Sequence, residues 1–153
     1  MRSLKIFVVL LFVSSTQLSA QISFESYLSD SFNQTLPIIK EKLVDQKYEE
    51  KEVKNLITLT YYTWIDPFSI RIQYIFTKEG TLLTKTLTNA KENVNDAEKL
   101  FDILKELLFK NNGTTYTDNS MLGVKMLIWK SVDNLSIMLV RKGDQSMLKI
   151  IRI

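Results

Sequence analysis

Residues 68–77 alternate strictly between apolar and more polar side chains, a period of two that is typical of a β-strand with one buried face. Strand-like runs rich in Thr, Tyr, Ile and Leu flank this segment at residues 56–65 and 81–88. The connections, at residues 66–67 and 78–80, are too short to carry a parallel crossover. The sequence therefore predicts an antiparallel meander of three strands.

Three further strands are predicted in the last third of the chain, at residues 124–130, 135–141 and 147–153. Asp133-Asn134 and Gly143-Asp144 supply residues favoured in the turns between them. Together with the meander, these segments predict one antiparallel sheet of about six strands.

The first helical pattern runs from Phe24 to Leu43, where apolar residues recur at helical spacing. Pro37 interrupts this stripe, because proline removes a backbone donor and clashes with the preceding turn. We therefore expect a short N-terminal helix, followed by a second helix with Pro37 in its first turn that reaches about Gln46. The charged residues 47–54 are interpreted as a solvated helix end or a loop.

The clearest helical signal follows the first three strands. Asn95 is the predicted N-cap, with Glu98 three residues later, and Asn112-Gly113 ends the apolar periodicity. The polar residues 114–120 then form a loop. The predicted fold class is α+β, with one antiparallel sheet packed on two main helices on one face and a short N-terminal helix.

The two halves of the chain show a weak internal similarity. Residues 38–44 align with residues 103–109, and Trp64 and Trp129 keep the same offset of 65. This pattern indicates a tandem repeat of one helix and three strands, although amphipathic helices of similar composition also align with one another. The layout is similar, at the level of architecture only, to the tandem α/β repeats of secreted β-lactamase inhibitor proteins. That resemblance implies a fold and assigns no residue a function.

The first twenty residues have the order of a secretory signal peptide. Arg2 and Lys5 precede an apolar run from Ile6 to Val13, and a small residue, Ala20, stands at the expected cleavage point. The run is too short for a spanning helix, so no retained transmembrane segment is expected. The alternative is a buried N-terminal segment. We expect residues 1–20 to be a signal peptide, residues 21–153 to form one domain, and the protein to be exported to the periplasm or outside the cell.

Composition excludes several classes of function. The sequence contains no His and no Cys, so His-based nucleophile activation and the commonest metal ligands are absent. Without Arg2 and Lys5 the formal net charge falls from +3 to +1, which predicts no nucleic-acid partner. No cofactor or metal is expected. An exported chain that lacks cysteine and has a short leader is most typical of a bacterial protein.

If the helices cover one face of the sheet, the opposite face is left to water or to a partner. Strand alternation predicts the side chains on that face, which include aromatic residues, Met and Arg, the types enriched at the centres of protein interfaces. The candidate binding residues are Tyr62, Trp64, Arg71, Gln73, Trp129 and Met138. Ordinary core packing is the alternative interpretation for both tryptophans.

Three functions remain open. The first is a non-catalytic protein-binding module, acting as an inhibitor, a chaperone-like factor or an immunity-type partner through the open sheet face. The second is a carrier that holds an apolar small molecule between the helices and the sheet. The third is a hydrolase based on carboxylates, but most acids outside the helices, such as Asp66 and Asp144, lie in predicted turns, where Asp is favoured for local hydrogen bonding.

Overall fold

The computed structural model describes residues 23–130 and 134–153, so the expected signal peptide and Asp133 lie outside the described residues. This part of the chain has an α+β fold in which helices pack on one antiparallel sheet. The helices are α1 (Phe24–Ser29), α2 (Leu36–Lys42) and α3 (Val94–Asn112). The strands are β1 (Tyr48–Val53), β2 (Leu56–Ile65), β3 (Phe68–Thr77), β4 (Leu82–Asn89), β5 (Thr117–Asp118), β6 (Val124–Lys130), β7 (Leu135–Lys142) and β8 (Gln145–Arg152).

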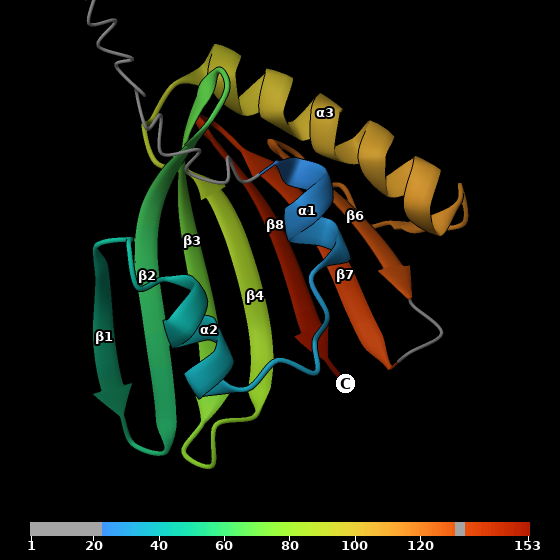
Figure 1. Cartoon of the computed structure of the whole chain (residues 1–153). Coiled ribbons are helices and arrows are strands. Elements are labelled where there is room, and N and C mark those ends of the chain that lie inside the picture. Colours follow the sequence, from blue (N-terminus) through green and yellow to red (C-terminus); the bar gives the residue numbers. More distant parts are fainter. Residues whose placement is uncertain (1–22, 131–133) are drawn as a thin grey trace, which may run out of the picture.

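The strands of the described chain form one eight-stranded sheet in the order β1-β2-β3-β4-β8-β7-β6-β5. Strands β1 to β4 form one meander and β5 to β8 form a second (Figure 1). The two meanders meet where β4 pairs antiparallel with β8 at the centre of the sheet. The prediction of about six strands is wrong, because the sheet has one additional strand at each edge.

The additional edge strand β1 occupies the charged segment expected to be a helix end or a loop. Five of its six residues are exposed, so it has no buried face to produce an apolar alternation. Its Glu50 side chain forms an ion pair with Lys40 of α2, with 2.7 Å between Oε2 and Nζ. Charged edge strands oppose pairing with other chains, which explains why this strand has the composition of a surface loop. The other edge strand, β5, is only two residues long and lies in the predicted polar loop.

All three helices of the described chain lie on the same face of the sheet (Figure 1). Only α3, with 19 residues, is long, whereas α1 has six and α2 has seven. The expectation of two main helices is therefore corrected to one long helix and two short ones. Pro37 lies in the first turn of α2, as predicted, but α2 ends at Lys42 rather than near Gln46.

The long helix begins two residues earlier than its predicted cap. Asn93 is the N-cap, and its side-chain oxygen accepts hydrogen bonds from the backbone N–H groups of Asn95 and Asp96 at 2.9 and 3.1 Å. The prediction of Asn95 as the cap is wrong, because two asparagines at this spacing offer the same side-chain acceptor. The helix ends at Gly113, as predicted, with a backbone φ of 75° that favours glycine.

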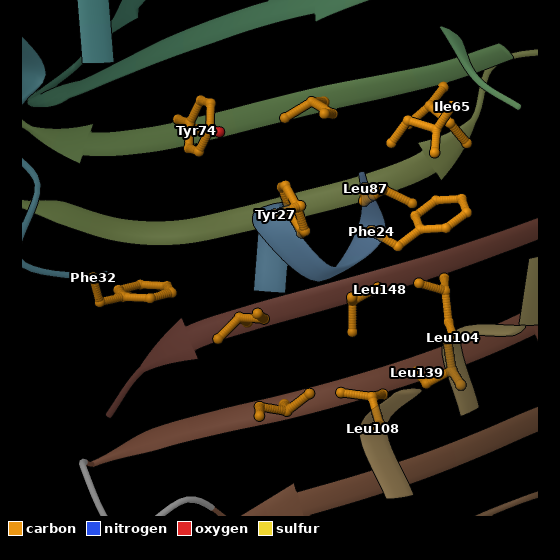
Figure 2. Packing of buried hydrophobic residues seen from close by; sticks show 14 of the residues in the cluster. Phe24, Tyr27, Phe32, Ile65, Tyr74, Leu87, Leu104, Leu108, Leu139 and Leu148 are labelled. Atoms are coloured by element: carbon orange, nitrogen blue, oxygen red, sulfur yellow. The ribbon is translucent and has the colours of Figure 1, made fainter. Parts of the chain in front are cut away.

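One cluster of buried apolar side chains fills the space between the helices and the sheet. Phe24 and Tyr27 of α1 pack over the central strands, while Leu104 and Leu108 of α3 pack toward β7 and β8 (Figure 2). The buried residues of β3 are its strictly alternating apolar set, which begins with Phe68. The alternation that predicted this strand thus also identifies its core-facing side.

In each half of the described chain a helix precedes four strands: α2 precedes β1 to β4, and α3 precedes β5 to β8, while α1 lies ahead of the first group. The predicted repeat of one helix and three strands is therefore corrected. The equal tryptophan offset does not correspond to equivalent positions. Trp64 pairs with Ser69 and is 53% exposed, whereas Trp129 pairs with Ile137 and is 1% exposed. Trp64 alternates with the buried residues of β2, whereas Trp129 is one of the buried residues of β6, so the two tryptophans lie on opposite faces.

Candidate functional site

The face of the sheet opposite the helices, here called the open face, carries five of the six candidate residues. Strand register places the Tyr62 position opposite Arg71, and Gln73 between Thr60 and Thr86. Tyr62 is 58% exposed, and its neighbour two residues on, Trp64, extends the same row of exposed aromatic side chains. The sequence therefore places these aromatic residues on the correct face. Their role in binding stays a prediction.

Trp129 does not belong to this face, and its predicted position is corrected. It is buried on the helix side, where its indole N–H donates to the Gly113 carbonyl at 3.1 Å. Its ring lies 5.8 Å from Phe109 in an edge-to-face arrangement and 5.2 Å from Tyr116. Trp129 therefore fastens the C-terminal end of α3 to β6. Core packing, the alternative interpretation for Trp129, is thus confirmed.

Half-buried apolar side chains, including the candidate Met138 of β7, cover the open face over β6, β7 and β8. These residues alternate with buried core residues along each strand, so they lie opposite the helices. We call them the apolar patch. Its members are Met126, Ile128, Met138, Val140, Met147 and Ile151. Met138 is the one member that was among the candidate residues. Alternation had also placed Val140 on this face, whereas β6 was expected to present its other side and β8 was assigned no side.

The charges on the open face are mainly positive. By register and alternation, Glu49 is the one carboxylate that the eight strands place there. The strand cations on the same face are Lys51, Arg71, Lys130, Lys142 and Lys149. A face that carries an apolar patch over β6 to β8, with Lys149 within it and further cations elsewhere, is complementary to a surface that is apolar and acidic.

Arg71 is a half-buried cation of this face. Its side chain is partly buried between neighbouring strands, and its Nε has no hydrogen-bond partner among the described residues. It also forms no ion pair within that part of the chain. Gln73, two residues along the strand, is instead held by a 3.1 Å hydrogen bond from its Nε2 to the Thr60 hydroxyl. Arg71 of β3 thus has one buried N–H donor without an acceptor in the described chain.

The helix side of the sheet contains a buried lysine that the sequence analysis did not select. Lys85 of β4 is 1% exposed, and its Nζ donates 2.8 Å hydrogen bonds to the carbonyl oxygens of Tyr27 and Asp30. Nζ also lies 4.8 Å from the centre of the Tyr27 ring. Burial lowers the pKa of Lys85 to about 8. The residue holds the C-terminal end of α1 against the sheet. A lysine between Thr84 and Thr86 gives no sequence signal for this position.

Among the acids outside the helices, Asp118 of β5 has a local hydrogen-bonding role. The Ser120 hydroxyl, followed by the Ser120 backbone N–H that donates to Asp118 at 2.8 Å, lowers the pKa of the Asp118 carboxyl group. Across residues 23–130 and 134–153, no three His, Cys, Asp or Glu residues come together as a set of metal ligands. In the same residues, no helix has the length and apolar character needed to cross a membrane.

Comparison with protein families, with characterised proteins and with solved structures finds no match to this chain. Function must therefore be argued from the two faces of the sheet.

Proposed function

We propose that this protein is a non-catalytic binding module that holds a partner protein on the open face of its sheet. The carrying observation is that one face of the eight-stranded sheet is covered by helices, while the other presents Tyr62, Trp64 and the apolar patch. The exposed aromatic side chains and the half-buried Met side chains supply apolar area that is removed from water when a partner covers them. Inhibitor, chaperone-like and immunity-type roles all fit such a module.

The partner surface should combine apolar and acidic groups. The strand cations of the open face outnumber its one strand carboxylate, Glu49, so a basic partner would be repelled. Arg71 forms no ion pair within the described chain, so an acidic group of the partner would supply its counter-charge. The apolar patch favours a protein surface over a nucleic-acid backbone, which offers phosphates but little apolar area.

The proposed setting is the periplasm or the exterior of a bacterial cell. It is supported by the order of charged, apolar and small residues that ends at Ala20. Mass spectrometry of the protein recovered from its own cells tests this. A mature chain that begins at Gln21 would support export, whereas a retained Met1 in the cytoplasmic fraction would contradict it.

The binding proposal is tested with two matched valine variants. Val140→Lys places a charge in the apolar patch, and Val44→Lys places the same charge at a position 76% exposed on the helix side. Each variant serves as bait against the envelope and secreted fractions of the source cells. A partner that the wild type and Val44→Lys retain equally, and that Val140→Lys loses, would support the open face as the binding surface. Equal retention by all three chains would contradict it.

A further inference from the structure

A cavity of about 280 Å³ lies on the helix side of the sheet, separate from the open face. It opens between α1, α2 and the strands β2 and β3. The lining residues are Ser26, Tyr27, Asp30, Ile39, Lys42, Leu43, Gln46, Tyr61 and Tyr74. At about 30 Å³ for each water molecule in the liquid, this volume is far more than one ordered water needs. It is close to the lower end of the sizes found for small-molecule sites, which is roughly 300 Å³.

One polar group of the lining is buried without a partner. Tyr27 is 1% exposed, and its hydroxyl makes no hydrogen bond to any described residue. Leaving such a group unsatisfied costs about 1–3 kcal/mol, so it needs water or a ligand as its partner. The pKa of Tyr27 is raised by burial and, to a lesser extent, by the nearby Tyr61 and Asp30, which line the same cavity. The unpaired hydroxyl therefore belongs to this group of side chains.

The remaining lining combines aromatic and aliphatic surface with other hydroxyl groups. The Tyr61 and Tyr74 rings lie nearly parallel, 6.2 Å apart between centroids with 19° between their planes. Ile39 of α2 and Leu43 just after it add aliphatic surface from the opposite side. Burial raises the pKa of Tyr61 to about 12 and raises that of Tyr74 as well. All three phenols therefore remain neutral at ordinary pH and can donate hydrogen bonds.

The charges at the cavity compensate one another. Lys42 Nζ lies 3.0 Å from Asp30 Oδ1, and the same carboxylate oxygen accepts a hydrogen bond from Gln34 at 3.2 Å. Lys42 and Asp30 are the charged residues of the lining, so a charged ligand would have to break their ion pair to gain a counter-charge. This arrangement favours an uncharged ligand.

We propose that this cavity binds a small neutral organic molecule with a ring-sized apolar body and one carbonyl or ether oxygen that accepts a hydrogen bond from Tyr27. The apolar lining residues are at most 4% exposed in the free chain, so they separate to admit the ligand. The ring then packs among Tyr61, Tyr74 and the aliphatic side chains, and the oxygen satisfies the buried hydroxyl. This site is independent of the partner-binding proposal, because it lies on the other side of the sheet.

Acetophenone is a suitable probe, since it has one ring and one carbonyl oxygen and carries no charge. Titration of the mature chain, followed through backbone amide shifts in ¹H–¹⁵N spectra, is expected to move the resonances of Tyr27, Leu43, Tyr61 and Tyr74. Benzoate, of the same size but charged, and isopropylbenzene, without an acceptor, should bind more weakly. Saturation of the solution with acetophenone without shifts at these residues would overturn the proposal and leave a water-filled cavity.

The variant Tyr27→Phe separates binding from folding. It removes only the unpaired hydroxyl, so the free energy of unfolding should stay equal or rise. A neutral hydrogen bond is worth about 1 kcal/mol, so the affinity for acetophenone should fall roughly fivefold. The control Tyr62→Phe removes an exposed hydroxyl on the open face and should leave the affinity unchanged. Equal acetophenone affinity in Tyr27→Phe and wild type would overturn the assignment of the hydroxyl as donor.

Val140→Lys distinguishes the two proposals. Because the apolar patch and the cavity lie on opposite faces, this variant should bind acetophenone with wild-type affinity even where it loses the protein partner. Loss of acetophenone binding together with loss of the protein partner would contradict the independence of the two sites.

Discussion

The two tryptophans have different environments because they lie on opposite faces of the sheet. Trp64 is exposed on the open face, whereas Trp129 is buried and hydrogen-bonded to Gly113. Strand β3 has one apolar and one polar set of residues, so alternation placed Arg71 and Gln73 correctly. Strand β6 is apolar in both sets, and alternation could not decide which set faces the helices. The side of Trp129 depends on tertiary packing that its strand sequence does not encode.

The two tryptophans should therefore differ in their contribution to stability. Trp129→Ala leaves a cavity beside Phe109 and removes a hydrogen bond, and it should lower the free energy of unfolding by about 3–5 kcal/mol. Trp64→Ala, at an exposed position, should change it by no more than about 0.5 kcal/mol. Urea denaturation measures both values. Similar losses for the two variants would show that the faces are misassigned.

Fluorescence checks the same assignment without a stability measurement. In the variant Trp64→Phe, emission comes only from Trp129 and should be protected from acrylamide. In Trp129→Phe, the remaining Trp64 should be quenched strongly. The reverse order of quenching would contradict the placement of both residues.

Lys85 gives the protein a specific pH dependence. Its pKa is about 8 in the folded chain and 10.5 for an ordinary lysine. Between these values the native state releases the proton while the unfolded state keeps it, so stability rises with pH relative to a variant that lacks the amine. The neutral amine still has two N–H donors for the Tyr27 and Asp30 carbonyl groups.

Lys85→Met is the reference variant for this effect, because it keeps an unbranched side chain without a titrating group. The difference in unfolding free energy between wild type and Lys85→Met should be flat below pH 8. It should then move in favour of the wild type as the pH rises toward 10.5. Tyr61 titrates in both chains and cancels from the difference. A difference that falls over this range would mean that the two hydrogen bonds favour the charged amine more than burial disfavours it.

At the scale of elements, apolar periodicity predicted the strands that bury a face and missed those that do not. Residues 56–65, 68–77 and 124–130 were recognised because each contributes side chains to the core. Strand β1 has no buried face, so its charged sequence resembled a loop. Helix α3 was recognised from its apolar stripe, but its start could not be fixed, because Asn93 and Asn95 both suit a cap.

The start of α3 is tested by two asparagine substitutions. Asn93→Ala removes the acceptor for two backbone N–H groups and should lower the free energy of unfolding by about 1 kcal/mol. Asn95→Ala, within the first turn, should change it by less than about 0.5 kcal/mol. Thermal or urea unfolding measures both. A larger loss for Asn95→Ala would restore Asn95 as the cap.

At the scale of the whole molecule, the sheet separates two environments. The helix side holds the core, the buried Lys85 and the cavity beside Tyr27. The open face holds exposed aromatic residues, the apolar patch and an excess of cations. The sequence predicted that such a face exists, but its apolar patch depends on strand register across β6, β7 and β8. These strands are consecutive in the chain, but β6 and β7 are largely apolar in both alternating sets, so alternation within one strand does not reveal which set faces away from the helices.

Site-specific photocrosslinking in the source cells is the most direct test of the open face as a partner-binding surface. p-Benzoylphenylalanine is introduced at Trp64, which is exposed on the open face, or at Val44, which is exposed on the helix side. Irradiation should join one defined protein to the chain labelled at position 64, and the Val140→Lys substitution should abolish that product. The same product at equal yield from position 44, or no product from position 64, would contradict binding through the open face.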